Sequence, residues 1–368
     1  MRSPGRWTRS LRGAAILVAI LVVVAILGSE VGSASQERIV IGFFINLTVV
    51  LGLQMFTGNS GVVSLGHLAF MGVGAYVAAV LASPPAVKAA VIPEAPFGLT
   101  DVEVAAPLVV VSALVVTGVV ALVSGLAVTR QVGISATIVS LALLVVVHNV
   151  LLNWVDVTRG ARAFYGIPIK TSINSALAMA VVAVVVARLF RDSTSGLQLR
   201  AGGEDPLAAA SMGVGVRRLR LLSWVLGALL VGVAGVAYAF FLGTISPDAF
   251  YFHATFLTLA MLLLGGMRSV SGAVVGAIFV TVGYEVMRDL ESGSELGGLT
   301  LPTLPGLADF FLGAVIVLVM ILRPDGLVGD DEIDETVARR LGRRRLHEPS
   351  LSPSGPAPAI EAVERGEA

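Results

Sequence analysis

Residues 106–129 have the sequence APLVVVSALVVTGVVALVSGLAVT, which contains no charged residue. A helix of a water-soluble domain carries a polar face along one side, and this stretch is apolar all round. Residues 219–241 are likewise apolar all round, with Arg220 near their start as the one charged residue. About 20 apolar helical residues cross a hydrocarbon core of about 30 Å. Both stretches are therefore predicted to be transmembrane helices.

The rest of the chain repeats this apolar character. Of the 368 residues, 56% are hydrophobic and 14% are charged, whereas about 25% of an ordinary soluble domain is charged. Apolar segments predicted to be helices lie at 14–28, 39–56, 62–82, 106–129, 133–152, 172–190, 219–241, 252–267, 270–289 and 307–322. The chain is thus predicted to be an all-α integral membrane protein, a polytopic bundle of about ten transmembrane helices.

The distribution of positive charge orients this bundle, because short cytoplasmic loops carry an excess of Lys and Arg. With the N-terminus inside, the cytoplasmic side receives Arg2, Arg6, Arg9, Arg12, Arg130, Arg188, Arg191, Arg200, Arg217, Arg218, Arg220, Arg268, Arg323 and all the arginines of the tail. The external side receives Arg38, Lys88, Arg159, Arg162, Lys170 and Arg288. Both termini are therefore predicted to lie in the cytoplasm.

Three regions follow from this pattern. Residues 1–38 form a basic cytoplasmic N-terminus and a first helix, which also resembles a signal peptide because small residues follow it at 32–35. An uncleaved anchor is preferred, and the topology downstream is the same in either case. Residues 39–328 form the transmembrane domain. The tail, 329–368, is acidic, then basic, then rich in Pro, Ser and Ala, so it is expected to be cytoplasmic and disordered.

Several kinds of site are excluded by residue type. The chain has no cysteine, which excludes disulfides and thiolate chemistry. Its only lysines, Lys88 and Lys170, follow Val87 and Ile169, so there is no phosphate-binding Gly-Lys-Ser/Thr loop. His-Glu-x-x-His and Gly-x-Ser-x-Gly motifs are also missing. We expect no catalytic residue, metal or cofactor in this chain, and its formal net charge of zero gives no reason to expect nucleic acid.

The loop at 191–218, predicted to be cytoplasmic, encodes one short helix whose two ends are marked. Asp205 can cap the free N–H groups, Pro206 suits the first helical position, and Gly213 suits the left-handed residue that ends a helix. An isolated helix this short is marginal in water, so such capping favours a helix that docks on a partner. The alternative is a surface helix between two spans.

The residues of this loop carry a resemblance to a known class. Glu204, Ala208, Ala209 and Gly213 resemble the Glu-Ala-Ala…Gly loop of ABC importer permeases, where it is the coupling helix that contacts the ATPase subunit. The resemblance implies that the ATPase-coupling residues here are Glu204, Asp205, Pro206, Leu207, Ala208, Ala209, Met212 and Gly213.

A second block, TGNSGVVSLGHLAFMGVGAY at 57–76, resembles the N-terminal signature of branched-chain amino acid permeases. Further matches are Thr158-Arg159-Gly160, Gly166-Ile167-Pro168, Ser246-Pro247, Leu264-Gly265-Gly266-Met267 and Arg323-Pro324-Asp325-Gly326-Leu327, so that the resemblance covers roughly residues 39–328. It favours the M-type over the H-type permease of the pair. Residues 162–165, Arg-Ala-Phe-Tyr, depart from the family's richer Gly, Leu and Ser, which bears on substrate identity.

The resemblance implies a permease subunit in a bacterial plasma membrane, importing leucine, isoleucine and valine. It implies as partners a second, H-like permease, two ATPase subunits that bind ATP-Mg, and an extracytoplasmic substrate-binding protein. Permeases for urea, amides or other small polar solutes share the resemblance and remain an alternative. An ion-coupled secondary transporter is another, although it would need buried ionisable residues that this chain almost lacks.

Polar and glycine residues at membrane depth are the candidates for the substrate path. Irregular backbone in a membrane is tolerated only where it lines a cavity or is covered by protein. The candidates are Asn59, Gly61, Ser64, Gly66, His67, Gly72 and Tyr76, with close helix packing as the alternative. Candidate packing positions, within the chain or against a second permease, are Gly265, Gly266, Gly272 and Gly276. Glu285, an acidic residue late in a span, is a further functional candidate, with a carboxylate that simply reaches the membrane interface as the alternative.

Overall fold

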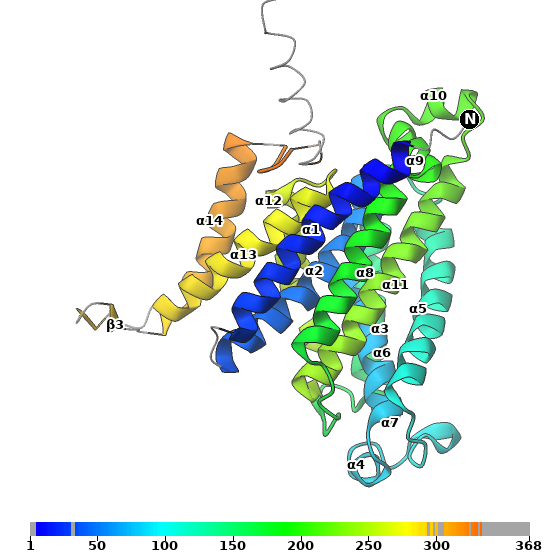
Figure 1. The fold of residues 1–368 in the computed structure, drawn as a ribbon. Coiled ribbons are helices and arrows are strands. Elements are labelled where there is room, and N and C mark those ends of the chain that lie inside the picture. The colour runs from blue at the N-terminus through cyan, green and yellow to red at the C-terminus, as the bar shows by residue number, and fades with distance from the viewer. Residues whose placement is uncertain are drawn as a thin grey trace, which may run out of the picture. The chain divides into compact units, whose positions relative to one another are not determined.

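Helices account for nearly all the regular structure in the part of the chain that the computed structural model describes, residues 5–30, 34–292, 295–296, 299–300, 305–323, 325–329 and 332 (Figure 1). The strands are two residues long: β1 (Phe164–Tyr165) pairs antiparallel with β2 (Thr244–Ile245), and β3 (Glu295–Leu296) with β4 (Leu299–Thr300). The predicted all-α membrane fold is confirmed. The predicted tail lies outside the described residues except for Gly329 and Glu332.

Eight helices of the described ranges are long and apolar enough to cross a membrane. They are α1 (Gly5–Glu30), α2 (Ala34–Ser60), α5 (Ala106–Val128), α6 (Ile134–Asn153), α8 (Ile173–Asp192), α11 (Val216–Leu242), α12 (Phe252–Gly265, with the preceding 3-10 helix η2, Pro247–Phe250) and α13 (Val270–Glu291). Two other predicted segments correspond to shorter helices, α3 (His67–Ala82) and α14 (Leu307–Leu322). The protein is therefore multi-pass, and the exact number of spans stays a prediction.

Short elements fill the connections. α3 is followed, after a 118° bend, by α4 (Pro85–Val91), and the Pro-rich segment continues in a 3-10 helix, η1 (Pro96–Gly98). α7 (Val155–Thr158) follows α6. α9 (Thr194–Glu204) and α10 (Pro206–Ser211) connect α8 to α11.

The helix predicted over 62–82 is wrong in its first turn, because residues 61–66 are not helical. Gly61 has a positive φ of 69°, which turns the chain out of α2. Protein groups then satisfy this irregular backbone: Leu65 N–H donates to the Ser140 hydroxyl at 3.1 Å, and the Thr137 hydroxyl donates to the Val63 carbonyl at 2.8 Å. The segment is thus covered by α6, as irregular backbone inside a membrane requires.

α11 is the centre of the packing, with α2, α3 and α5 against it. The α3–α11 contact depends on small residues: a Cβ on Gly74 would collide with the carbonyl oxygen of Gly232, and a Cβ on Gly235 with that of Met71. In lipid there is no hydrophobic drive between helices, so close backbone approach of this kind supplies the packing energy. Trp224 of α11 is fully buried within the same contact region.

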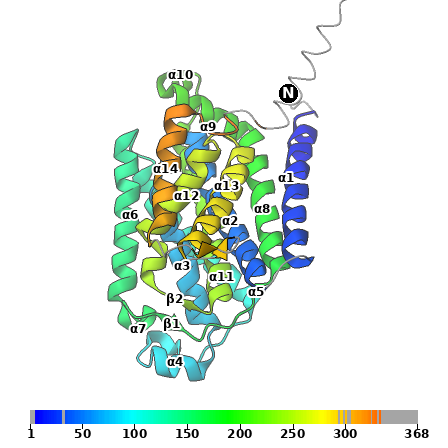
Figure 2. The ribbon, with the colours of Figure 1, turned by 90° about the vertical axis from the view of Figure 1, so that its left-hand side faces the viewer.

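The connecting segments gather at two ends of the bundle (Figure 2). One end holds α9, α10 and the start of α1, where the Ser10 hydroxyl donates to the Arg188 carbonyl at 3.5 Å. The α5–α6 turn is tied to the same end by Arg220, which donates to the Gln131 carbonyl, and the residues after α14 by Leu327, whose N–H donates to the Leu264 carbonyl. α4 and α7 lie at the other end. Segments predicted to share the cytoplasmic side thus share one end, and which end faces the cytoplasm stays a prediction.

Candidate functional site

The predicted short helix of the 191–218 loop is α10, and its two ends are built as the sequence indicates. The Asp205 carboxylate accepts hydrogen bonds from Leu207 N–H at 2.9 Å and Ala208 N–H at 3.0 Å. Pro206 is the first helical residue. Beyond the helix Gly213 has a φ of 77°, and Val214 N–H donates to the Ala209 carbonyl at 3.0 Å. These local predictions are confirmed.

α10 presents apolar side chains to the outside. Leu207 is 84% exposed and Met212 82% exposed, whereas Ala209 is buried against the rest of the loop. A helix of this length has little stability of its own in water. Exposed apolar side chains on a capped helix are suited to contact with a partner.

The end of α9 is tied to the turn between α12 and α13. Glu204, which immediately precedes the cap residue, forms an ion pair of 2.6 Å with Arg268. Both side chains are largely exposed, so the pair contributes at most about 1 kcal/mol. Behind it Arg191 donates to the Arg268 carbonyl at 3.2 Å, and Arg200 donates to the Arg191 carbonyl at 3.3 Å. These contacts fix the loop that carries α10 to the bundle.

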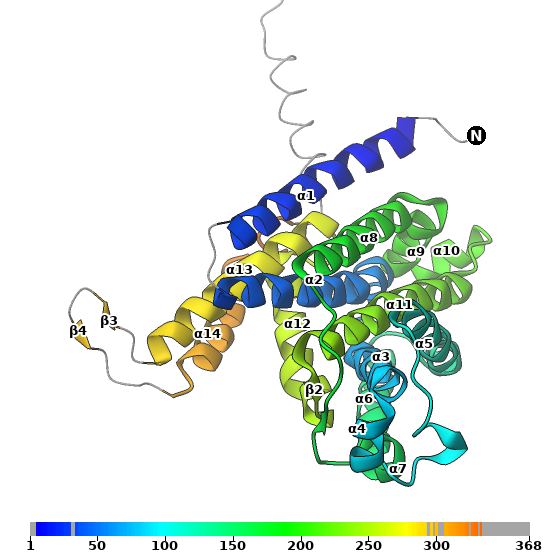
Figure 3. The same cartoon turned by 60° about the horizontal axis from the view of Figure 1, so that its bottom comes forward.

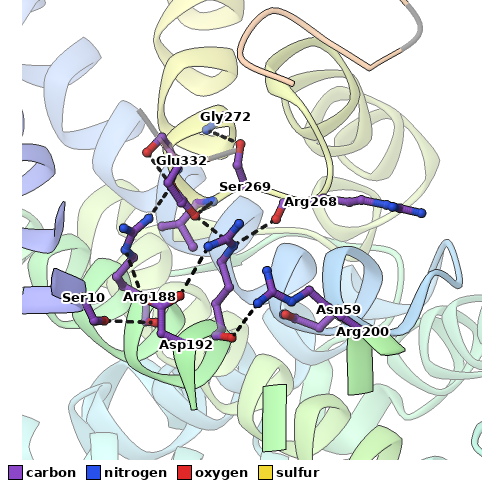
Figure 4. Close-up of polar contacts among 12 residues, drawn as sticks. Ser10, Asn59, Arg188, Asp192, Arg200, Arg268, Ser269, Gly272 and Glu332 are labelled. Atoms are coloured by element: carbon purple, nitrogen blue, oxygen red, sulfur yellow. Dashed lines mark hydrogen bonds and ion pairs between the residues drawn. The ribbon is translucent and has the colours of Figure 1, made fainter. Parts of the chain in front are cut away.

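A buried carboxylate lies at the centre of this polar cluster, which Figure 4 shows. Glu332 is fully buried, and its two oxygens face Arg188 at 2.6 Å and Arg191 at 3.0 Å, both on α8. The same carboxylate caps the start of α13, accepting from Val270 N–H at 2.9 Å and Ser271 N–H at 3.0 Å. Glu332 therefore joins the segment after α14 to α8 and α13.

The arginines keep this buried carboxylate ionised. Burial alone would raise the pKa of Glu332, but the charges of Arg191 and Arg188 and the hydrogen bonds from Ser271 outweigh burial and hold the pKa below its ordinary value. Sequence reasoning missed this residue, because Glu332 stands among the acidic residues of the tail. The signal that could have found it is the pair Arg188 and Arg191 at the end of a span, where both need an anion.

Three of the predicted path residues are buried around the junction of α2 and α3, and one of them, His67, also contacts α11. His67 is buried among the rings of Phe56, Phe70 and Trp224, with the Trp224 centroid at 4.7 Å. Its Nδ1 lies 2.7 Å from the Ser64 hydroxyl. Asn59, also buried, donates to the Met55 carbonyl at 2.9 Å.

The remaining predicted path residues are spread along the same helices. Gly61 lies beside Gly203 of α9, and a Cβ on Gly66 would collide with the Ser140 carbonyl. Further along α3, Gly72 faces Leu151 and Phe250, and the ring of Tyr76 packs against Phe250 with centroids 6.3 Å apart. The structure therefore does not gather all seven at one point, and their role in a substrate path stays a prediction.

The four candidate packing glycines lie where α12 meets α13. A Cβ on Gly265 would collide with the Gly272 carbonyl, and one on Gly276 with the Met261 carbonyl. Gly266, with a φ of 120°, ends α12 at this crossing. Contact with a second permease at these positions stays a prediction. Over the ranges that the structure describes, no group of three or more His, Asp or Glu side chains could hold a metal ion.

Comparison with known proteins shows one consistent similarity. The model of the family described as "Branched-chain amino acid transport system / permease component" matches residues 35–320. The high-affinity branched-chain amino acid transport system permease protein LivM of Escherichia coli K12 is 27% identical over 315 residues, covering 76% of this chain and 66% of the relative.

Two further relatives come from Salmonella typhimurium. LivM of that organism is 26% identical over 342 residues, covering 84% of this chain and 73% of the relative. LivH, also called a high-affinity branched-chain amino acid transport system permease protein, is 28% identical over 157 residues, covering 43% of this chain and 46% of the relative. The chain thus spans slightly less than two thirds of the length of the Escherichia coli relative. No solved structure matches it.

Proposed function

This chain belongs to the family of permease components of branched-chain amino acid transport systems, and from that premise we propose that it forms half of the translocation path of an ABC importer for leucine, isoleucine and valine. A permease component is a transport subunit and not an enzyme. ATP-Mg is bound and hydrolysed, on this proposal, by partner ATPase subunits. The absence of a Gly-Lys-Ser/Thr loop from this chain supports that division of labour.

The partners of the proposal follow from the relatives and the two ends of the bundle. Similarity to both LivM and LivH supports a second, H-like permease in the same complex. The end that carries α10 faces two ATPase subunits in the cytoplasm. The end with α4 and α7 faces an extracytoplasmic binding protein, and the membrane is the bacterial plasma membrane.

One observation supports ATPase coupling above the others. α10 is held at both ends by Asp205 and Gly213, and it exposes Leu207 and Met212 at the end of the bundle that the charge distribution assigns to the cytoplasm. A rigid helix with apolar anchors transmits the movement of a docked ATPase to the spans on either side, α8 and α11. Glu204 and Arg268 connect the same loop to α12 and α13.

The coupling proposal is tested in the reconstituted complex by measuring substrate-stimulated ATP hydrolysis. Leu207→Asp should reduce it about tenfold or more, because a charge replaces an apolar anchor in an interface. Gly213→Pro should act in the same way, since proline cannot adopt a φ of 77°. Glu204→Lys places two cations together and should also weaken coupling.

Matched variants separate coupling from folding. Val132→Asp changes another exposed apolar side chain at the same end but outside α10, and should leave stimulation intact. Gly213→Asn retains a residue that tolerates the left-handed conformation, and should restore most of the activity lost in Gly213→Pro. Unchanged stimulation in Leu207→Asp would refute docking through α10.

The substrate is tested by uptake of labelled leucine into proteoliposomes that contain the complex and its binding protein. Uptake should be inhibited by unlabelled isoleucine and valine and not by urea. Competition by urea or an amide with none by any aliphatic amino acid would replace this proposal with the small-polar-solute alternative.

A further inference from the structure

A cavity of about 370 Å³ lies between α2, α12 and α13, away from the coupling end. Figure 3 shows these three helices beside one another. α2 ends at Ser60, next to Gly203 of α9, so its first half, which lines the cavity, lies at the opposite end. The volume is within the range of small-molecule binding sites.

One wall of the cavity is a polar stripe on α2. Arg38, Gly42 and Asn46 follow one another at four-residue spacing and therefore lie on one face of the helix. Asn46 is near the middle of this 27-residue helix, yet its side chain forms no hydrogen bond with a described residue. Arg38 stacks over the Phe241 ring at 5.4 Å and has no carboxylate partner among the described residues. Among the described residues, this wall thus offers a guanidinium that pairs with no carboxylate and an amide that forms no hydrogen bond.

The facing wall is the second half of α13, which contributes a carboxylate. Glu285 is 22% exposed, and its nearest cation is Arg288 at 3.6 Å, beyond hydrogen-bond distance and itself 66% exposed. A carboxylate on a membrane-spanning helix is costly unless it faces a partner or a polar path. The lining also includes apolar side chains, among them Phe43 of α2 and Leu257 and Met261 of α12.

We propose that this cavity binds a zwitterionic α-amino acid with an aliphatic side chain: Arg38 receives the carboxylate, Glu285 the ammonium group, and Phe43, Leu257 and Met261 the side chain. The inference rests on the proposed function and locates its substrate. Arg38, Glu285 and the apolar side chains match the three groups of leucine, with Arg288 lining the cavity beside Glu285, whereas urea carries no charge. The site lies in the half of the bundle that the charge distribution assigns to the outside, where a binding protein would release substrate.

The absence of cysteine from this chain provides a direct assay. Asn46→Cys is made in the complete complex, and its modification by a charged methanethiosulfonate is followed on this chain by mass spectrometry. Leucine should slow the modification about elevenfold at ten times its half-protecting concentration, as simple occupancy requires. Urea and 4-methylpentanoate, which is leucine without its ammonium group, should not protect at that concentration. Val102→Cys, exposed and outside the cavity, should react at the same rate with or without leucine.

Glu285 is tested in the Asn46→Cys background. Glu285→Gln should raise the half-protecting leucine concentration about tenfold or more, because a charge-assisted contact is lost. The ratio of the half-protecting concentrations of 4-methylpentanoate and leucine should shrink by the same factor. A general disturbance of folding would not change this ratio. Glu37→Gln, on the same end of the bundle but not lining the cavity, is the matched control.

A steric block tests the path itself. A Cβ on Gly42 meets no atom within 4 Å, so Gly42→Trp fills the cavity without disturbing the helix contacts. It should abolish leucine uptake while ATP hydrolysis stimulated by the binding protein persists. Gly313→Trp, at an exposed helical glycine of α14 whose Cβ would also meet nothing, should retain both.

The outcomes distinguish this inference from the proposed function. If the Asn46→Cys complex accumulates leucine but leucine does not protect the cysteine, the site is refuted and the proposed function stands. If the wild-type complex accumulates no branched-chain amino acid, the proposed function fails and this inference fails with it. Protection by leucine that Glu285→Gln weakens, together with the selective effect of Gly42→Trp, supports the site. Should Gly42→Trp not fold, the cysteine assay decides alone.

Discussion

The carboxylate of Glu332 shows how one buried charge can organise the end of a helical bundle. Removing a carboxylate from water costs several kcal/mol, and only well-placed charged or hydrogen-bonding partners offset this desolvation cost. Here two guanidinium groups and two backbone N–H groups of α13 face its oxygens. Removing this one acid would therefore leave Arg188 and Arg191 with the partly exposed Asp192 as their remaining carboxylate partner among the described residues, and would remove two hydrogen bonds from the start of α13.

Glu332→Gln should lower the free energy of unfolding by about 3–5 kcal/mol, the cost of removing one partner from a buried ion pair. Glu204→Gln removes one partner of an exposed pair and should cost no more than about 1 kcal/mol. The measurement is the unfolding midpoint of the two variants and of wild type in the same detergent. Equal, small shifts in both variants would contradict a structural role for the buried pair.

The pH dependence of this stabilisation has a definite sign. The pKa of Glu332 in the folded chain lies below its ordinary value of 4.5, so the unfolded chain takes up the proton first on acidification. The stabilisation is therefore complete above pH 4.5 and is lost as the pH falls through the lower, folded value. The difference in midpoint between wild type and Glu332→Gln should be equal at about pH 7 and about pH 5.5 and narrow only in stronger acid. A difference that closes near neutral pH would contradict this assignment.

At the scale of elements, the sequence predicted those helix ends that depend on residues within the helix and its caps. The two ends of α10 follow from Asp205, Pro206 and Gly213, whose effects act within a few residues. The start of α3 did not follow, because residues 62–66 continue an apolar run but are held out of a helix by hydrogen bonds to Thr137 and Ser140 of α6. Contacts between segments far apart in the chain determine where such a helix begins, and these contacts cannot be read from a single sequence.

The candidate sites show the same limit. Asn59, Ser64 and His67 stand out in the sequence as polar residues in an apolar block, and the fold buries all three. Arg38 and Glu285 lie far apart in the chain, and nothing local indicates that their helices face one cavity. Glu285 could be singled out as an intramembrane acid, but its counterpart on α2 becomes visible only in the fold.

The glycine contacts between α3 and α11 give a prediction for elements. Gly74→Ala and Gly235→Ala should each destabilise the bundle by about 1–3 kcal/mol, because the added methyl group forces two backbones apart. Gly118→Ala, in α5, meets only Leu229 at 3.5 Å and should be neutral or stabilising by up to about 1 kcal/mol. Unfolding midpoints and the yield of monodisperse protein after size exclusion measure both effects. Similar midpoints for all three variants would show that the α3–α11 contact is not close-packed.

Across the whole described bundle, two helices join the cavity to the coupling end. α2 runs from Arg38 and Asn46 at the cavity to Ser60, which touches Gly203 of α9. α13 runs from Ser271, held by Glu332, to Glu285 at the cavity. A shift of α9 and α10 on a docked ATPase would therefore act on both walls of the proposed substrate site through continuous helices.

This arrangement requires a definite orientation in the membrane, which single-cysteine labelling can test in intact cells. Ser211→Cys lies on α10, and Glu94→Cys lies in the exposed segment after α4, at opposite ends of the bundle (Figure 1). Because Arg217, Arg218 and Arg268 belong to the α10 end, that end should face the cytoplasm. An impermeant thiol reagent should then modify Glu94→Cys in intact cells and Ser211→Cys only after the membrane is permeabilised. The reverse pattern would place α10 out of reach of any cytoplasmic ATPase, and the coupling proposal would fall together with the predicted topology.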